Sequence, residues 1–240
     1  MNKAENNVYY SFISDGEGPK GISLRSWLDQ ASTALVIVDM QNYMTDRAYT
    51  SRWSADGGDD YYFTRLEQVC LPNIQKLISC FRDQGSRIIY LRIAYSDAHL
   101  ADVPAGVSRR RLAEELIDAE GNKFSLHEDA NTGMIDERIA PLDGDIVIQK
   151  TSSGAFCTST IDLTLRSNSI TSLVFVGGIT EACVSSTLRE AFDRGYLCTL
   201  VEDGCISSRE DYHESCVRIL ENYFAWVVTT EKLLSFAGSL

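Results

Sequence analysis

Three residues whose types can cooperate in bond cleavage each follow an apolar run of the chain. Asp39 ends ALVIVD, Lys150 ends DIVIQK, and Cys183 comes shortly after SLVFVGG, within VFVGGITEACVSSTLREAFDRG. A thiolate is a strong nucleophile toward an acyl carbon. A carboxylate can take the thiol proton and later return it to a leaving amine. An ammonium group can stabilise the thiolate and keep the carboxylate ionised.

Each of these residues also has an ordinary structural interpretation. A cysteine in an apolar helical pattern is usually a small core residue, and the other six cysteines are interpreted in this way. An aspartate after a strand is often a cap or turn residue. A lysine at a strand end is usually solvated. The common position of all three beside predicted strand ends is what favours chemistry.

The apolar runs predict six strands, and helical patterns separate them. The runs are mostly continuous rather than alternating, which is typical of strands buried on both faces; they cover 34–39, 86–94, 145–150, 172–178, 197–203 and 224–230. The helical patterns cover 64–84, with a kink or restart at Pro72 and an end at Gly85, then 155–167, a segment from Cys183 to Gly195, and 209–222. This alternation predicts an α/β fold, a six-stranded and mostly parallel sheet with helices on both faces.

Ligands of open parallel sheets bind outside the carboxyl ends of the strands, so Asp39, Lys150 and Cys183 are expected to meet there. Cys183 would lie in the first turn of its helix. The helix dipole and unpaired N–H groups at this position predict a lowered thiol pKa. Backbone N–H groups at 179–183 can hold an oxyanion, and the loss of one such donor costs about two to three orders of magnitude in rate.

Composition limits the other function classes. The chain has 240 residues, a formal net charge of −12 and seven cysteines. This charge argues against nucleic acid and anionic membrane partners. No apolar run approaches the about 18 residues of a membrane span, and the N-terminal stretch lacks the apolar region of a signal peptide. The odd, scattered cysteines without a CxxC pair predict a reduced, cytoplasmic protein. No glycine-rich phosphate or dinucleotide loop is present, so no cofactor is expected.

The chain is expected to form a single domain. Residues 1–32 are polar and predict an irregular N-terminal arm, which leaves 33–240 for the domain. The stretch 96–140 contains polar loops and no obvious strand. We interpret it as an insertion near the site.

The motifs ALVIVDMQNYM, IQKTSSGAF and GGITEACVSSTLREAFDRGY, followed by VED, resemble the isochorismatase-like cysteine hydrolase family. The resemblance extends from about residue 33 to the C-terminus, and the 96–140 stretch carries little of it. It implies a Rossmann-like three-layer α/β/α fold. It also implies that Asp39, Lys150 and Cys183 are a catalytic triad.

The same resemblance implies a special turn before the cysteine. A cis peptide bond is expected between Gly178 and Ile179, and Gly178 stands where the family more usually has Val, Ile or Leu. The N–H groups of Ile179 and Cys183 are expected to form the oxyanion hole. Thr180 is expected to cap the helix, and Glu181 to interact favourably with the helix dipole.

Within the family, DMQNYM and CVSSTLREAFDRGY are most similar to hydrolases of ureidoacrylate, biuret and N-carbamoyl amino acids. The resemblance implies a small amide or ureido substrate and a homodimer or homotetramer. Nicotinamidases carry an Asp/His metal cluster shortly after the first motif. None of His99, His127 and His213 lies between 40 and 98, so no metal is expected. His127 and His213 are interpreted as surface or helix residues.

Three residues are predicted to contact the substrate: Asn42, Tyr43 and Phe156. Asn42 can hydrogen-bond a ureido group or form a turn, and Phe156 can wall the pocket or pack in the core. Tyr43 and Trp53 flank SADGGDD, which is expected to act as a lid within 43–60. The run of Arg109, Arg110 and Arg111 can bind a substrate carboxylate or begin a solvated helix.

Three functions are compatible with these features. The preferred one is a cofactor-free cysteine amidohydrolase that works through a covalent thioester on Cys183. The second is an isochorismatase-type vinyl-ether hydrolase, which retention of activity in Cys183→Ser would favour. The third is a non-catalytic homologue that binds a ligand, which an unreactive Cys183 would favour.

Overall fold

The computed structural model describes residues 28, 30–49, 59–97, 99–107, 116–118 and 120–237. Within these ranges, six parallel strands form one sheet in the order β3-β2-β1-β4-β5-β6. The strands are β1 (Thr33–Val38), β2 (Arg87–Ile93), β3 (Ile146–Lys150), β4 (Ser172–Gly178), β5 (Leu197–Ile206) and β6 (Trp226–Val228). The predicted parallel α/β sheet is confirmed.

Helices connect the strands. The α-helices are α2 (Asn42–Thr45), α3 (Asp59–Arg65), α4 (Leu71–Asp83), α6 (Ile161–Ser167), α7 (Ser185–Asp193), α8 (Glu210–Tyr223) and α9 (Thr230–Ala237). Two π-helical turns, η4 (Leu66–Cys70) and η7 (Thr180–Val184), precede α4 and α7. Short 3-10 turns are η2 (Gln30–Ser32), η5 (Asn131–Gly133) and η6 (Glu137–Ile139). A membrane-crossing helix would need more length and apolar character than any helix in the described ranges has.

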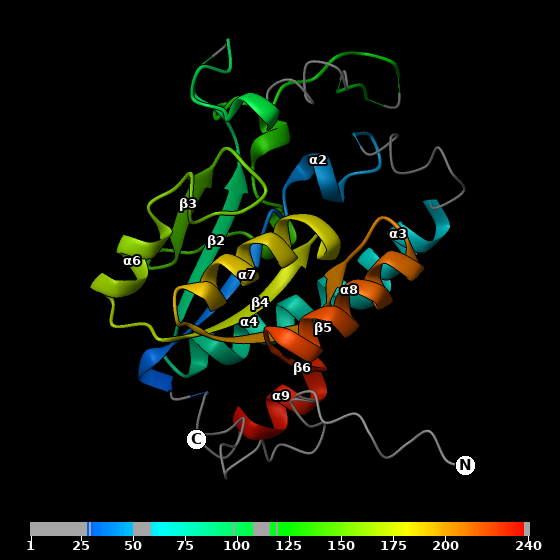
Figure 1. The fold of residues 1–240 in the computed structure, drawn as a ribbon. Coiled ribbons are helices and arrows are strands. Elements are labelled where there is room, and N and C mark those ends of the chain that lie inside the picture. The colour runs from blue at the N-terminus through cyan, green and yellow to red at the C-terminus, as the bar shows by residue number, and fades with distance from the viewer. Residues whose placement is uncertain are drawn as a thin grey trace, which may run out of the picture.

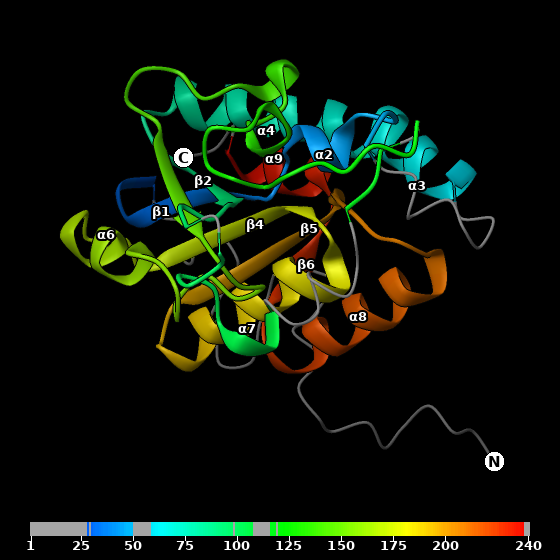
Figure 2. The same ribbon diagram turned by 90° about the horizontal axis from the view of Figure 1, so that it is seen from above.

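The sheet separates two hydrophobic cores, which makes the fold a three-layer α/β/α arrangement. Figure 2 shows α4 and α9 on one face of the sheet and α7 and α8 on the other. All six residues of β1 are buried, and their side chains alternate between the faces. Leu35 and Ile37 belong to the core that includes α4, whereas Val36 and Val38 belong to the core that includes α7. This double burial explains the continuous apolar runs of the sequence.

The helical stretch before β2 is interrupted near the expected place. Pro72 lies in the first turn of α4, immediately after η4, and Gly85 follows the helix with a φ of +69°. A residue in this left-handed conformation is a common helix terminator, and glycine adopts it without a steric cost. The predicted helix at 155–167 is too long, because α6 begins only at Ile161.

Two predicted strand boundaries are also wrong. β5 continues to Ile206 although Glu202 and Asp203 are polar, and its pairing with β4 changes register between Phe175 and Gly177. Asp203 does not end the strand, because its carboxylate accepts hydrogen bonds from the N–H and hydroxyl of Thr230 at the start of α9, at 2.7 and 2.8 Å. β6 is shorter than the predicted 224–230.

The carboxyl ends of the strands point toward α2, and much of the described chain between β2 and β3 lies beyond this end of the sheet (Figure 1). The described parts of 96–140 contribute no strand to the sheet. They are fastened to the first motif by two backbone hydrogen bonds, from Asn42 N to Met134 O at 2.9 Å and from Asp136 N to Met40 O at 3.0 Å. The interpretation of 96–140 as an insertion, and of 33–240 as one domain, stays a prediction.

Candidate active site

The structure brings Asp39, Lys150 and Cys183 together at the carboxyl end of the sheet. Lys150 Nζ donates to Asp39 Oδ2 at 2.7 Å, and neither side chain is exposed to solvent. Lys150 Nζ also donates to the Ser152 carbonyl at 2.8 Å. The Cys183 thiol is partly buried and interacts with both partners of this ion pair.

Asp39 has an unusual backbone and one unused carboxylate oxygen. Its φ is +49°, a left-handed conformation that few non-glycine residues adopt and that aspartate tolerates better than most. Its N–H donates to the Leu91 carbonyl of β2 at 2.9 Å, which fixes the chain as it leaves β1. Lys150 donates to Oδ2, whereas Oδ1 is buried and accepts no hydrogen bond from any described residue. Oδ1 is therefore the oxygen left to accept a proton.

The electrostatics of the site keep the thiol neutral at rest. Burial raises the pKa of Cys183 to about 12, Lys150 lowers it, and Asp39 raises it further. The expectation of a lowered thiol pKa is wrong, because burial and the Asp39 carboxylate outweigh the cation and the helix terminus. Burial lowers the pKa of Lys150, but Asp39 and Cys183 raise it, and the net shift is upward. The resting site thus combines a charged ammonium with a protonated thiol.

Two glycines let β4 deliver the cysteine beside Asp39. Gly177 has a φ of +112°, and a Cβ there would lie 2.2 Å from the Val38 carbonyl oxygen of β1. A Cβ on Gly178 would lie 2.8 Å from side-chain carbons of Ile206 and 3.0 Å from the Met44 methyl. Ile206 and Met44 therefore fill the space that a larger residue at 178 would need.

The turn after β4 contains both predicted oxyanion donors. The Gly178–Ile179 peptide bond is cis, at the position where the resemblance implies one. Ile179 is the N-cap residue of η7, with extended backbone angles, so the expectation that Thr180 caps the helix is wrong. Cys183 is the fourth residue of η7, so its N–H lies in the first turn of the helix.

The sequence from residue 33 to residue 232 matches the family model of the isochorismatase domain. The chain belongs to the isochorismatase family. The resemblance found in the motifs is thereby confirmed, and the match includes all three residues of the predicted triad.

Curated relatives of this isochorismatase domain include ureidoacrylate amidohydrolases. The RutB protein of Variovorax paradoxus is 30% identical over 217 residues, which cover 88% of this chain and 83% of the relative. The RutB protein of Acinetobacter baylyi is 29% identical over 217 residues, which cover 85% of this chain and 82% of the relative.

Solved structures share the fold. A cysteine hydrolase from Pseudomonas syringae superposes with a TM-score of 0.73 at 19% identity, covering 89% of this chain and 95% of the other. N-carbamoylsarcosine amidase from Thermoplasma acidophilum superposes with a TM-score of 0.59 at 21% identity, covering 83% of this chain and 97% of the other.

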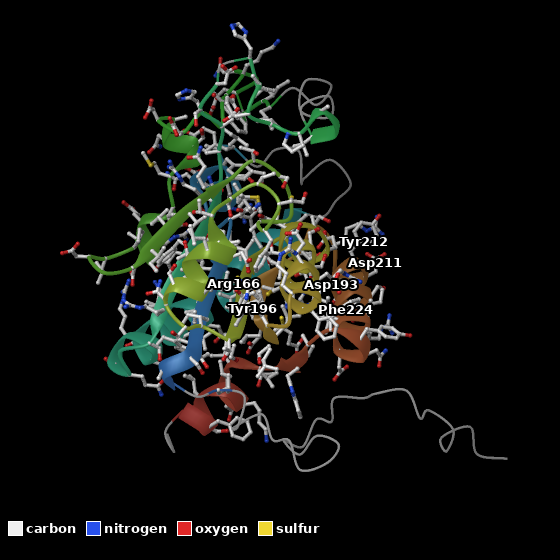
Figure 3. The ribbon with its side chains drawn as sticks, turned by 60° about the vertical axis from the view of Figure 1, so that its left-hand side comes forward. Arg166, Asp193, Tyr196, Asp211, Tyr212 and Phe224 are labelled. Atoms are coloured by element: carbon white, nitrogen blue, oxygen red, sulfur yellow. The ribbon has the colours of Figure 1, made fainter. Side chains whose placement is uncertain are left out.

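The three predicted substrate contacts have other partners in the structure, and their contact with a substrate stays a prediction. Tyr43 is buried in the core that includes α4. Phe156 is buried in the other core, where its ring centroid lies 5.8 Å from that of Tyr196. Tyr196 lies on the α6 side of the molecule beside Arg166 (Figure 3). Phe156 thus occupies a core position, which is the packing alternative considered for it.

The Asn42 side chain is hydrogen-bonded to the 96–140 stretch. Its side-chain Nδ2 donates to the Asn131 carbonyl at 2.9 Å. It lines a hollow of about 710 Å³ together with Asn131, Met134 and Arg138, and no triad residue lines this hollow. Trp53, the SADGGDD stretch up to 58, Arg109, Arg110, Arg111 and most of the N-terminal arm lie outside the described residues.

Sequence reasoning missed Gln41, which joins the first motif to two other elements. Its side chain is fully buried. Nε2 donates to the carbonyls of Ile93 and Gly133 at 3.0 and 2.8 Å, and Oε1 accepts from the Ile93 N–H at 2.7 Å. A buried amide with three hydrogen bonds fixes Asp39 relative to β2 and the 131–133 turn. A glutamine directly after a buried strand end was the available signal.

Glu190 was also missed, and it holds the loop that follows Lys150. From α7, its carboxylate accepts from the Phe156 N–H at 2.8 Å. A Cβ on Gly154 would lie 2.5 Å from the same carboxylate, so the loop approaches the helix closely. Ser152, whose carbonyl binds Lys150, donates from its hydroxyl to the Gly154 carbonyl at 2.7 Å. The helix that follows Cys183 therefore also positions Lys150.

His213 is the third residue that the sequence left without a role. It lies in α8 as a helix residue, but it is buried rather than on the surface. Its ring nitrogens contact Thr180 and Arg65. In the described part of the chain, no group of three His, Cys, Asp or Glu side chains is arranged to hold a metal ion.

Proposed function

We propose that the protein is a cysteine amidohydrolase that cleaves a C–N amide or ureido bond of a small molecule. The observation that carries the proposal is the fully buried Lys150–Asp39 ion pair, 2.7 Å between Nζ and Oδ2, beside the Cys183 thiol. Burying an ion pair is costly unless its geometry is good. The Lys150–Asp39 pair forms no part of the hydrophobic packing that stabilises the sheet. The named activities of the RutB relatives and of the amidase with the same fold support this chemistry.

In the first half of the reaction, the thiol becomes a nucleophile only when it attacks. Asp39 Oδ1 takes the Cys183 proton as Sγ forms a bond to the substrate carbonyl carbon. The carbonyl oxygen becomes an oxyanion, which the N–H groups of Ile179 and Cys183 stabilise. Asp39 then gives its proton to the substrate nitrogen, the C–N bond breaks, and the amine or ammonia leaves a thioester or thiocarbamate on Cys183.

In the second half, water replaces the amine. Asp39 takes a proton from water while the water oxygen bonds to the carbonyl carbon. The C–S bond breaks, the acid or carbamate leaves, and the proton on Asp39 returns to the thiolate. Lys150 keeps its proton throughout, because its raised pKa favours the ammonium form. It offsets the negative charge that moves between carboxylate and sulfur.

The raised thiol pKa makes Asp39 necessary. With a Cys183 pKa of about 12, only a minute fraction of the thiol is ionised at neutral pH. A general base in contact with the thiol removes the need for a preformed thiolate. This interaction favours the thioester route over a vinyl-ether hydrolase, which does not require the cysteine.

We further propose that the enzyme works in the cytoplasm, without a cofactor, as a homodimer or homotetramer. All seven cysteines are free, which supports a reducing compartment. Exposed apolar side chains on the edge strand β3 and on α8, such as Val147 and Ile219, support self-association. Light scattering during size-exclusion chromatography tests this directly, and a mass equal to a single chain would contradict it.

A substrate panel tests the proposed reaction. The panel contains ureidoacrylate, biuret, N-carbamoyl amino acids, maleamate and nicotinamide, with isochorismate as the vinyl-ether arm. The expected result is ammonia release from one or more ureido or carbamoyl compounds. Turnover of isochorismate alone, or silence of the whole panel with a Cys183 that also resists alkylation above pH 10, would contradict the proposal.

A further inference from the structure

The turn that carries Cys183 is attached to two neighbouring elements through one residue, Thr180. The Thr180 hydroxyl donates to the Ile206 carbonyl at the end of β5, at 2.9 Å. The same hydroxyl lies 2.9 Å from Nδ1 of His213 on α8. The Thr180 carbonyl accepts a weaker bond from the Cys216 thiol, also on α8, at 3.5 Å. Thr180 is fully buried, so these partners replace water completely.

Arg65 fixes the tautomer of His213. An Nη2 of Arg65 lies 2.7 Å from Nε2 of His213, and a guanidinium can only donate. Nε2 must therefore accept, and the ring hydrogen must be on Nδ1. Nδ1–H then donates to the Thr180 oxygen, whose own hydrogen goes to Ile206. In this series of hydrogen bonds, which leads from Arg65 through His213 and Thr180 to Ile206 of β5, each donated hydrogen therefore has one acceptor.

Arg65 is itself held in place. Its Nε donates to the Cys205 carbonyl and its Nη2 to the Glu202 carbonyl, both at 2.8 Å. The Glu202 carboxylate lies 3.9 Å from Nε2 of His213. Burial and the positive charge of Arg65 lower the pKa of His213 to about 3. The imidazole is therefore neutral in the range where enzymes work, and it is not a proton carrier.

We propose that His213 is a positioning residue for the nucleophile: fixed by Arg65, it orients Thr180 and thereby holds the turn that presents the Cys183 thiol to Asp39. The inference rests on the proposed function, in which thiol and carboxylate must exchange a proton. A displacement of about 1 Å between reacting groups can cost about a hundredfold in rate. A chain of directional hydrogen bonds between α3, α8 and β5 limits such displacement.

Thr180→Val tests the link, because valine has the shape of threonine without the hydroxyl. We expect kcat to fall about ten- to a hundredfold while KM changes less than about threefold. Since Asp39 contributes to the raised pKa of Cys183, loosening the turn should also move the pH midpoint of Cys183 alkylation down toward the ordinary value of about 8.5. Thr199→Val is the matched control, because Thr199 is buried in β5 and its hydroxyl has no partner among the described residues.

Two substitutions of His213 separate its two hydrogen bonds. Asparagine places an amide near the position of Nδ1 and can still donate to Thr180. Glutamine reaches the position of Nε2 and can satisfy Arg65, but it leaves Thr180 without its donor. We expect His213→Asn to retain more of kcat than His213→Gln, by about fivefold or more, with an alkylation profile closer to the wild type.

Two results would overturn the inference. One is a Thr180→Val protein whose kcat and alkylation midpoint match those of Thr199→Val even if its melting temperature falls. The other is His213→Gln performing as well as His213→Asn, and this pair also decides the matter if Thr180→Val does not fold. Alkylation needs no substrate, so failure of the proposed function, seen as undiminished hydrolysis in Cys183→Ala, is distinct from failure of this inference.

Discussion

At the scale of single residues, the meeting of Asp39, Lys150 and Cys183 could be predicted from the sequence, but the direction in which the pKa of Cys183 shifts could not. Asp39 and Lys150 directly end apolar runs and Cys183 follows one, so the geometry of a parallel sheet was enough to bring them together. The pKa of Cys183 depends on burial by side chains distant in sequence, and it moves opposite to the local helix argument. His213 has a helical pattern that gives no sign of its burial against Arg65 and Thr180.

Alkylation of Cys183 reports its charge state. We expect the rate with iodoacetamide to keep rising about tenfold per pH unit through pH 10, because the folded pKa is about 12. Asp39→Asn removes a carboxylate that raises this pKa, so the variant should alkylate faster than the wild type at pH 8.5 while losing hydrolysis. Mass spectrometry of the Cys183 peptide measures the alkylation rates of the wild type and of the variant, and ammonia release measures hydrolysis. A plateau near pH 9 in the wild type, or slower alkylation in the variant, would count against the account.

Removal of Lys150 should be costly to the fold. Lys150→Met leaves the buried Asp39 carboxylate unpaired, and we expect a loss of about 3–5 kcal/mol in the free energy of unfolding at pH 7. The pKa of Lys150 is raised, so its contribution is complete below the ordinary lysine pKa of about 10.4 and is lost only as pH rises through the raised value.

Urea unfolding measures this effect, with Lys76→Met as the control. Lys76 is exposed on α4, and among the described residues it donates to Asn73, so its substitution should change stability by less than about 0.5 kcal/mol. Equal effects of the two substitutions would show that the Lys150–Asp39 pair is not a structural constraint.

At the scale of elements, the central strands could be predicted because burial on both faces leaves continuous apolar runs, as in β1. The errors occurred where tertiary contacts override local patterns. Residues 155–160 form a loop because the Glu190 carboxylate of α7 accepts a hydrogen bond from the Phe156 N–H. β5 continues past Asp203 because the Asp203 carboxylate accepts a hydrogen bond from the Thr230 N–H at the start of α9. Neither partner is near in sequence.

The turn after β4 offers a packing test at this scale. Gly178→Val should destabilise the protein by about 1–3 kcal/mol, because its side chain would overlap Ile206 and Met44. Ile206→Ala alone should cost about 2–5 kcal/mol, since Ile206 is fully buried. The double variant should be more stable than the sum of the two losses predicts, because each change relieves the other. Strictly additive losses in thermal unfolding would refute this packing.

At the scale of the whole molecule, the three-layer architecture followed from the order of elements, whereas the placement of the described parts of 96–140 did not. The described parts of 96–140 are placed by contacts with the first motif, among them Asn42 with Asn131 and Gln41 with Gly133. Such contacts join residues about ninety positions apart, and a polar sequence without periodicity does not specify them. The contacts of Asn42, Tyr43 and Phe156 with a substrate stay predictions.

The central claim is that the carbonyl carbon of a small amide becomes covalently bonded to Cys183 Sγ during hydrolysis. The most direct test is the hydrolysis rate of Cys183→Ala on a compound that the wild type cleaves, with Cys80→Ala, a partly buried thiol on α4, as the matched control. We predict a loss of about a thousandfold or more for Cys183→Ala and a rate within about twofold of the wild type for Cys80→Ala. A folded Cys183→Ala protein that keeps a tenth or more of the activity would contradict the account.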